Sequence, residues 1–529
     1  MKPSALSLVS SLLLSLVTVS SASADPPMQL VGQLLPWANG QFGGSVVDAA
    51  RNVAYMGSLN PDHGVAVIDI TDRANPVLVN ELPPVTFDPN NALSGSYNLD
   101  LVGRYLLASH HNELLHGFGG VSVWDISGDP FHPTHLRDIQ VNPFCGLESV
   151  RLDPEVESGR PYAYCNAHCF TAGGMYTVNI LTGQILSVFV SPEGQPCGPP
   201  FPCFIENFPH ESFVQRHPVS HKMLDYIGFW DSGLRIVDVT DSANPTEVGA
   251  FDYGPGTPFQ NAHGAVATPS GNWTYVGDEL ATDTTGVIHI FDTHGCDGTS
   301  HCTPTLVGFW HVPGHGVQDP GNAFSNFLRF DPHNMTVRGE NTLLYGNYGL
   351  GVRLADTSDK TNPQEISFYQ PNGSANGDQH RPGIYGPGPR TWVARFGSDG
   401  LVYASDINYG FFTVQLSPQT VLPQGAARFP NTGTEPGATA LSLRVGTAGA
   451  GGHSVTFTTR RDGPVSLSIF DAAGRRIAFV ARPYISAGTH TLTWDGHNAR
   501  GRPAPSGLYV ARLTTAEGSL STKLVHLAP

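Results

Sequence analysis

The sequence "GLRIVDVTDSANPTEVGAF" at residues 233–251 recurs along the chain with modest changes. Close copies are "GVAVIDITDRANPVLVNEL" (64–82) and "GVRLADTSDKTNPQEISFY" (351–369). In each copy an alternating apolar run ends at an aspartate, a turn containing Asp, Asn and Pro follows, and a second extended run begins. Such short runs bounded by turn residues are typical of β-strands, and their regular recurrence predicts a repeat architecture.

Seven units of this kind can be aligned. Six begin with a glycine, and a seventh, "VIHIFD" (287–292), fits after a one-residue shift; the glycines are Gly64, Gly120, Gly174, Gly233, Gly351 and Gly410. The unit that ends at 251 holds four extended runs, of which "SFVQRH" (212–217) is the first. Four-stranded sheets repeated around a centre form a β-propeller, so we expect an all-β chain.

The N-terminal part of the chain supports closure of this propeller. Each repeat ends in a strand such as "PTEVGAF" (245–251), but the last unit (401–418) has none. A run of that type, "MQLVGQLLP", stands at 28–36. We predict that it completes the last sheet and removes open edges, giving a seven-bladed propeller over 26–419. The alternative, an open solenoid, leaves an unpaired strand at each end.

The repeat "GLRIVDVTDSANPTEVG" resembles the LVIVD repeat of secreted and cell-surface bacterial propellers. The resemblance covers most of 45–419. It implies architecture and location more than chemistry, because that family is mostly without an assigned activity.

The C-terminal residues indicate a second domain. Residues 420–440 are a Pro/Gly/Thr-containing linker, and alternating strands with Gly-rich turns over 441–529 predict a small β-sandwich. The pieces "SIFDAAGRRI" and "WDGHNARGRPAPSGLYVARL" resemble the Ig-like domain of flagellar hook-capping proteins and C-terminal secretion-sorting domains. By this resemblance we expect a spacer, a surface anchor or a sorting tag.

The N-terminal residues and the net charge indicate where the protein is located and which partners are disfavoured. Residues 1–24 combine Lys2, an apolar stretch and Ala22-Ser23-Ala24, which predicts a secretory signal and a secreted or cell-envelope protein without a transmembrane segment. The formal net charge is −16, with no basic cluster, which disfavours nucleic acid as a partner. No nucleotide cofactor is expected.

Histidines concentrate at positions predicted to lie on one face of the propeller. "NFPHES", "QNAHGA" and "FDPHNM" place His210, His263 and His333 at equivalent starts of three successive inner strands, where the preceding units have Gly43, Tyr97 and Leu147. Further histidines fall on the loops between second and third strands, namely His110, His111 and His168. Imidazoles that converge on a channel mouth suit copper, zinc or iron.

Carboxylates near the same face are candidates to complete a metal shell or to orient the imidazoles. They are Asp231, Asp278, Glu279 and Glu211. The alternative is structural: each "PHN"-like histidine caps the turn that enters its strand and recurs because the blade recurs.

Seven cysteines in an exported chain favour disulfides. We expect Cys197 to pair with Cys203 and Cys296 with Cys302. Cys145 is expected to pair with Cys165 or Cys169, which leaves one thiol over.

The sequence leaves three alternative hypotheses for the function. The first is a surface-associated propeller whose histidine-rich face binds a small-molecule, glycan or protein ligand, with a transition-metal site. The second is a copper-dependent oxidoreductase, because the general layout is similar to propellers of the selenium-binding and methanethiol oxidase type. The third is a polysaccharide lyase with Tyr348 or Tyr409 as acid and His263 or His333 as base; the scarcity of basic residues there, Arg381 and Arg390 apart, disfavours it.

Overall fold

The computed structural model describes the chain in segments separated by gaps. These are residues 27–38, 41–87, 94–112, 117–168, 173–191, 208–253, 261–279, 286–312, 331–371, 389–418, 420–423, 442–447, 452–459, 463–471, 475–485, 488–498, 502–515 and 518–526. Within them the chain forms β-strands and one short 3-10 turn, η1 (Val156–Ser158), with no α-helix. These segments contain no helix with the length and apolar character needed to cross a bilayer. The predicted leader 1–24 and most of the predicted linker 420–440 lie outside the described residues.

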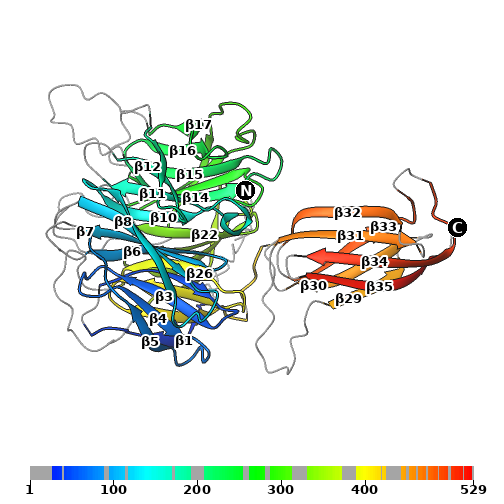
Figure 1. Cartoon of the computed structure of the whole chain (residues 1–529), viewed down its shortest axis with the longest axis horizontal. Helices are drawn as coiled ribbons and strands as arrows, with labels where there is room; N and C mark the ends of the chain where they lie inside the picture. Colours follow the sequence, from blue (N-terminus) through cyan, green and yellow to red (C-terminus); the bar gives the residue numbers. More distant parts are fainter. Residues whose placement is uncertain are drawn as a thin grey trace, which may run out of the picture.

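Strands β1 to β28 group into seven four-stranded antiparallel units in the described residues, numbered here as blades 1 to 7 (Figure 1). Blades 1 to 3 are β2 (Phe42–Asp48), β3 (Val53–Ser58), β4 (Val65–Asp69) and β5 (Val77–Leu82); β6 (Gly95–Val102), β7 (Tyr105–Asn112), β8 (Gly117–Asp125) and β9 (Thr134–Asn142); and β10 (Gly146–Leu152), β11 (Tyr162–His168), β12 (Met175–Asn179) and β13 (Ile185–Phe189). Blades 4 and 5 are β14 (Pro209–Arg216), β15 (Met223–Phe229), β16 (Gly233–Asp238) and β17 (Thr246–Phe251); and β18 (Ala262–Ala267), β19 (Trp273–Asp278), β20 (Ile288–Asp292) and β21 (Thr305–Trp310). Blades 6 and 7 are β22 (Pro332–Arg338), β23 (Thr342–Asn347), β24 (Gly351–Asp356) and β25 (Gln364–Tyr369); and β26 (Thr391–Phe396), β27 (Val402–Asp406), β28 (Gly410–Gln415) and β1 (Gln29–Leu34).

The blades are arranged in a closed circle. The first strand of each blade contacts the first strand of the next, and β26 of blade 7 contacts β2 of blade 1. Strand β1 pairs antiparallel with β28, with Gln29 opposite Gln415 and Leu34 opposite Phe411. The predicted closure by an N-terminal strand is therefore confirmed, and the open solenoid is wrong. The domain is a β-propeller.

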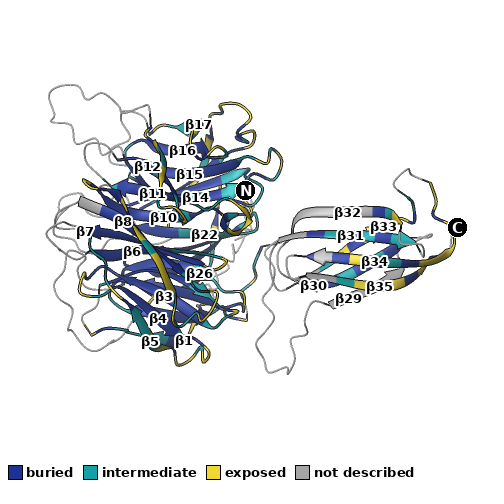
Figure 2. Cartoon of the chain, viewed as in Figure 1, coloured by how far each residue is buried: buried dark blue, intermediate teal, exposed yellow. Residues whose placement is uncertain are grey.

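Apolar cores lie between neighbouring blades. One cluster of buried side chains spans each of the seven blade-to-blade contacts. Tyr55 and Leu106 meet between blades 1 and 2, and Phe42 and Phe411 meet between blades 1 and 7. Buried residues follow the inner strands of the blades, whereas exposed residues lie in the connections and along outer strands such as β9 (Figure 2). Because each buried side chain of this size contributes roughly 1.5–3 kcal/mol, a blade is stabilised mainly by its two neighbours.

The repeated turn forms as its residues predict. Asp238 Oδ1 accepts a hydrogen bond from the Thr240 N–H at 2.9 Å. Asp241 accepts from the Ala243 N–H and, through its second oxygen, from Asn244 Nδ2 at 2.9 Å. Gly233 opens the third strand with a φ of 92°, a conformation that glycine adopts without strain. The aspartates and glycines of the repeat are therefore turn-formers.

A second glycine of the repeat allows close packing between blades. A Cβ on Gly308, in the last strand of blade 5, would lie 2.3 Å from the Lys360 carbonyl oxygen in the turn of blade 6. A Cβ on Gly32, in the closing strand β1, would lie 2.3 Å from the Arg73 carbonyl oxygen in the turn of blade 1. Strand β1 thus makes the same contact with its neighbour as an ordinary last strand does.

Residues after 441 form a β-sandwich (Figure 1). One sheet contains β29 (Ser442–Thr447), β30 (His453–Thr459) and β33 (Gly488–Trp494), and the other contains β31 (Gly463–Asp471), β32 (Arg476–Ile485), β34 (Gly507–Thr515) and β35 (Gly518–His526). Phe457 and Trp494 of the first sheet share one apolar core with Leu467 and Ile469 of the second. The two-sheet domain expected from the sequence is therefore present.

Substitution of Gly32 by alanine tests the closure. The added Cβ would collide with the backbone of the blade 1 turn, so we expect Gly32→Ala to destabilise the propeller by about 1–3 kcal/mol. Thermal unfolding measures the loss. Gly128→Ala is the matched control, because a Cβ there has no atom within 4 Å. Equal melting temperatures for the two variants would contradict closure by β1.

A buried carboxyl in blade 4 predicts a pH effect on stability. Burial raises the pKa of Asp225 from 3.8 to about 7, and Ser212 and Arg151 offset this only in part. The folded state holds this proton more tightly than the unfolded state. The Asp225 contribution therefore falls by about 1.4 kcal/mol per pH unit between roughly pH 4 and pH 7. In denaturant unfolding at pH 5 and pH 8, Asp225→Asn should lose that part of the pH dependence and be more stable than the wild type at pH 8. If the free energies of unfolding of the variant and the wild type changed equally between pH 5 and pH 8, this assignment would be wrong.

Candidate metal centre

A β-bulge near the start of every first strand shapes the centre of the propeller. In each blade the pairing of the first strand with the second shifts register at the bulge. The residues within the bulges are Gly43 and Gly44, Tyr97 and Asn98, Glu148, His210 and Glu211, His263, His333 and Asn334, and Trp392. A bulge redirects side chains relative to regular alternation, and here it does so at the same height in each blade.

Seven aromatic rings form a closed circle at this height, which we call the annulus. Its members are Tyr97, His111, His168, His210, His263, His333 and Trp392. Neighbouring ring centroids are separated by 4.8 Å for Tyr97–His111, 5.7 Å for His111–His168, 5.8 Å for His168–His210, 4.3 Å for His210–His263, 4.1 Å for His263–His333, 4.5 Å for His333–Trp392 and 6.3 Å for Tyr97–Trp392. The circle passes through blades 2 to 7, so histidines far apart in the sequence meet around one axis.

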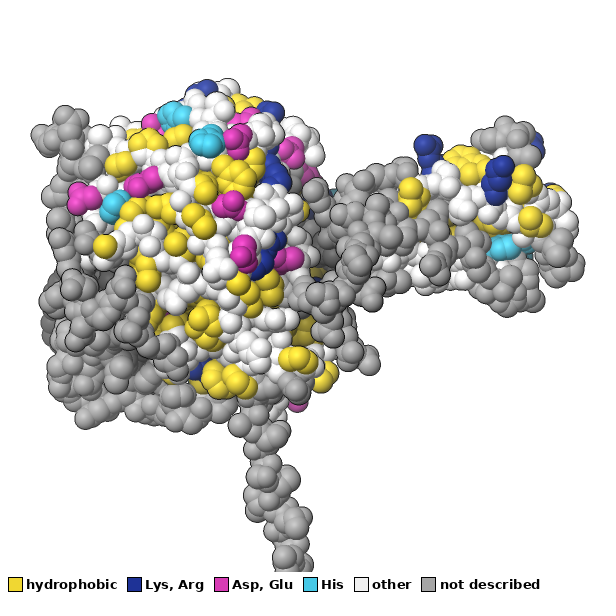
Figure 3. Space-filling view, turned by 90° about the horizontal axis from the view of Figure 1, so that it is seen from below, with side chains coloured by type: hydrophobic (Ala, Val, Ile, Leu, Met, Phe, Trp, Pro, Cys, Tyr) yellow, Lys and Arg dark blue, Asp and Glu magenta, His cyan; other side chains and the backbone are white. Residues whose placement is uncertain are grey.

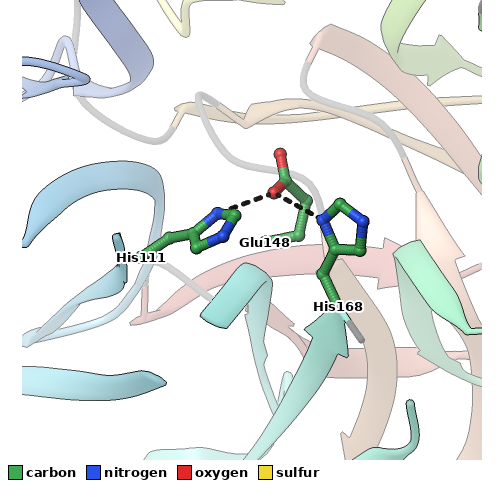
Figure 4. Close-up of side chains that lie close together, drawn as sticks. All are labelled: His111, Glu148 and His168. Atoms are coloured by element: carbon green, nitrogen blue, oxygen red, sulfur yellow. Dashed lines mark ion pairs between the residues drawn. The ribbon is translucent and has the colours of Figure 1, made fainter. Parts of the chain in front are cut away.

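Two groups within or beside the annulus have the donor set of a metal site. In the first, Glu148 Oε2 lies 3.3 Å from His111 Nδ1 and 3.7 Å from His168 Nδ1 (Figure 4). In the second, His210 and His263 lie beside Glu279, with Glu279 Oε2 at 3.7 Å from His263 Nε2. The ligand atoms of each group lie within 4.8 Å of one another. Two imidazoles and one carboxylate are a set that binds zinc or iron in proteins.

Burial favours the neutral, metal-binding form of the two imidazoles of the second group. Burial lowers the pKa of His210 to about 3 and lowers the pKa of His263 well below its usual value. His210 Nδ1 and His263 Nε2 are buried and have no hydrogen-bond partner among the described residues. A buried nitrogen without a partner costs stability, and a metal ion would satisfy such an atom. The residues present therefore fit a metal.

The carboxylate of the first group is ionised. Burial by itself would raise the pKa of Glu148, but the neighbouring imidazoles of His111 and His168, together with the nearby His210, lower it well below its usual value. The carboxylate is thus available as an anionic ligand between two imidazoles.

His333 has a defined orientation. Its Nδ1 lies 2.8 Å from the Trp392 carbonyl oxygen, so Nδ1 carries the proton and donates it, which places the lone pair on Nε2. Tyr348 stacks on the other side of the ring, with centroids 4.7 Å apart. A backbone carbonyl that fixes the tautomer is the usual partner of a metal-binding histidine.

The structure thus brings together five of the six predicted histidines and separates the sixth. His110 does not belong to the annulus: its Nε2 lies 2.6 Å from Ser122 Oγ within blade 2. It precedes His111 on β7, and adjacent residues of a strand face opposite ways. Burial lowers the pKa of His110 to about 4.

Of the predicted carboxylates, one joins a group at the annulus and the others lie elsewhere. Glu279 joins the second group, whereas Asp278 faces into blade 5, where Tyr253 donates to it at 2.9 Å. Glu211 faces the channel beneath the annulus, and Asp231 is half-buried and belongs to neither group of the described residues.

Glu148 was missed by sequence reasoning. The equivalent position in blade 3 was predicted to be Leu147, but Leu147 packs in the apolar core between blades 2 and 3. The register shift between Leu147 and Ser149 places Glu148 at the centre instead. Aligning the repeats identifies equivalent positions in the blades. It does not reveal a one-residue bulge, because a bulge has no signal of its own in the composition of the sequence.

The cysteines are placed as follows. Cys296 and Cys302 form a disulfide, and Cys145 is disulfide-bonded. Cys165 is a free, buried thiol, so the expected alternative of a Cys145–Cys165 pair is wrong. Its side chain packs in the apolar core between blades 2 and 3, away from a partner. Cys169, Cys197 and Cys203 lie outside the described residues.

Comparison with known proteins agrees with both sequence resemblances. Residues 225–253 match the LVIVD repeat, and residues 442–519 match the FlgD Ig-like domain. The chain therefore carries an LVIVD repeat and a FlgD-type Ig-like domain. No curated protein sequence matches the chain significantly.

Several solved structures are similar to this chain at low sequence identity. The C-terminal WD40 domain of Sif2 is 11% identical, with a TM-score of 0.46, over 75% of this chain and 100% of that one. PorZ, a bacterial surface component of the type-IX secretion system of Porphyromonas gingivalis, is 14% identical, with a TM-score of 0.39, over 90% of this chain and 64% of that one. Sqt1 of Saccharomyces cerevisiae is 9% identical, with a TM-score of 0.43, over 82% of this chain and 96% of that one.

Alkylation tests the assignment of Cys165. Burial raises the pKa of its thiol far above the usual range, so the thiolate is scarce and shielded. We expect iodoacetamide to leave Cys165 unmodified in the folded protein at pH 8 and to modify it after unfolding without reductant. Peptide mass spectrometry locates the label. Rapid modification in the folded state would show that the thiol is accessible.

Proposed function

We propose that this protein is an exported, surface-associated propeller that binds a transition metal in the annulus and binds a small-molecule, glycan or protein ligand at that face. The observation that carries the proposal is the closed circle of rings with two groups of two histidines and one glutamate. The predicted leader and the FlgD-type domain support export and attachment at the cell envelope.

The ligand atoms of the two groups restrict which metal ions could bind. Both groups consist of imidazole nitrogens and a carboxylate, which suit zinc, iron and cupric copper, whereas cuprous copper prefers sulfur ligands. Cys165 packs in an apolar core and belongs to neither group. Each set of three protein ligands leaves coordination positions for water or a ligand, as in catalytic rather than closed structural sites.

A metal-dependent oxidoreductase is the second candidate. The open coordination positions favour it, because a bound substrate could reach the metal directly. Oxygen consumption with thiol substrates by the metal-loaded protein distinguishes this candidate from a binding protein. The lyase hypothesis has less support. Tyr348 stacks beside His333 but is buried, and the Tyr409 carbonyl accepts from Gln33 at the closing strand, away from the annulus contacts described above.

Metal analysis of the purified protein tests the proposal. After dialysis against Zn²⁺, Cu²⁺ or Fe²⁺, we expect one or two equivalents of metal per chain by elemental mass spectrometry. The substitutions Glu148→Gln and Glu279→Gln should each weaken binding at their own group, by at least about tenfold, because each removes a charged ligand. Combining His210→Ala with His263→Ala should abolish binding at the second group.

His132→Ala is the matched control, since His132 is an exposed histidine outside the annulus. Its metal content should equal that of the wild type. Wild-type protein that folds normally and retains none of the three metals would show the metal proposal to be wrong.

A further inference from the structure

A cavity of about 730 Å³ occupies the other half of the central channel. Its walls come from the first strands of blades 3 to 7 and the turns that follow them. In the first strands of blades 4 and 6 the lining residues come after the annulus residue: Glu211, Ser212, Phe213, Gln215 and Arg216 follow His210, and Asn334 to Val337 follow His333. Since a strand advances about 3.3 Å per residue, the cavity extends away from the annulus toward the ends of the first strands.

A polar bridge separates the cavity from the annulus. Asn98 Nδ2 donates to Glu211 Oε1, and Asn334 Nδ2 donates to Asn98 Oδ1 at 3.3 Å. These residues belong to blades 2, 4 and 6, so the bridge crosses the axis. Ligands entering from the two ends of the channel would therefore meet different sites.

Two arginines give the cavity an excess of positive charge. Arg151 Nη2 pairs with Glu211 Oε2 at 2.8 Å, but Arg395 forms no ion pair among the described residues, and its Nε donates to the Ser45 carbonyl oxygen at 3.1 Å. Burial and the charge of Arg151 lower the pKa of Arg395, and the charges of Asp100 and Glu211 offset this in part. At the mouth, Arg216 is already paired with Glu155. One guanidinium at the cavity wall therefore has no carboxylate in direct contact among the described residues, although Asp100 and Glu211 lie near it.

The positive charge at the cavity contrasts with the charge of the rest of the molecule. The chain carries a formal net charge of −16, and Lys and Arg side chains are sparse on the face seen in Figure 3. Desolvating two neighbouring guanidinium groups costs free energy unless an anion pairs with them. Since Arg151 is already paired with Glu211, this cost falls mainly on Arg395, which has no direct ion pair among the described residues.

The remaining walls are apolar. Phe213, Val266, Met335 and Val337 line the cavity along three neighbouring strands. Gly264 keeps the wall open beside the bridge, since a Cβ there would lie 3.1 Å from Glu211 Cβ. A volume of this size and an apolar wall with a few convergent polar groups are typical of small-molecule sites.

We propose that this cavity binds a small organic anion, with its carboxylate on Arg395 and its apolar body against Phe213 and Met335. A carboxylate matches the planar fork of a guanidinium through two parallel hydrogen bonds. This site is independent of the proposed metal centre, because the polar bridge lies between them.

Calorimetric titration of the mature, full-length protein with hexanoate and phenylacetate tests the proposal. We expect saturable binding of at least one carboxylate and at least tenfold weaker binding of its amide, which has the same shape without the charge. Arg395→Met should weaken carboxylate binding at least tenfold, whereas Arg395→Lys should retain part of it. Arg104→Met is the matched control, as Arg104 is an exposed arginine outside the cavity.

The two proposals fail separately. Replacing His210 and His263 together by alanine should leave carboxylate binding unchanged, and adding carboxylate should not alter metal content. Should Arg395→Met fail to fold, the comparison of carboxylate with amide on the wild type decides. Equal binding of acid and amide, or no binding of either acid, would overturn the proposal.

Discussion

Apolar side chains between neighbouring blades hold the propeller together. Each blade of the propeller buries side chains on both faces, one against the blade before it and one against the blade after it. A linear stack would leave two faces and two edge strands in water. Pairing of β1 with β28 completes the last blade, and the cluster around Phe42 and Phe411 covers the faces. The circle, and with it the central channel, follows from this need to bury every face.

The bulges decide what the channel contains. Without them, regular alternation would direct the side chains of each first strand in turn toward the two neighbouring blades. With them, His210, His263 and His333 meet at one height, and Asn98, Glu211 and Asn334 meet just below. The channel is therefore layered into the annulus, the polar bridge and the cavity with its two arginines. The two ends of the channel differ in chemistry: imidazoles and carboxylates at one, guanidinium groups and apolar walls at the other.

This centre is not the arrangement that stability alone would select. Several imidazoles and carboxylates are desolvated there, and His210 Nδ1 and His263 Nε2 lack partners among the described residues. Apolar side chains of similar size would avoid that cost. A rigid ring of blades can tolerate it, since the stabilising contacts lie between the sheets and away from the axis. Such a division, with a stable frame and a polar centre, is expected of a binding site.

Much of the architecture was predictable from the residues. The repeated Asp and Gly positions define the turns, the alternating runs define the strands, and "MQLVGQLLP" defines the closing strand, because these features depend on local chemistry and a fixed period. The convergence of His210, His263 and His333 also followed from their equivalent positions in the repeat. The position of Glu148, the exclusion of His110 and the place of Arg395 at the cavity did not follow. They depend on register shifts of one residue and on contacts between blades, which no local pattern encodes. The sequence by itself determined the circle and its repeat; only the tertiary structure decided which side chains reach the axis, because a shift of one residue turns a strand's side chains to its other face.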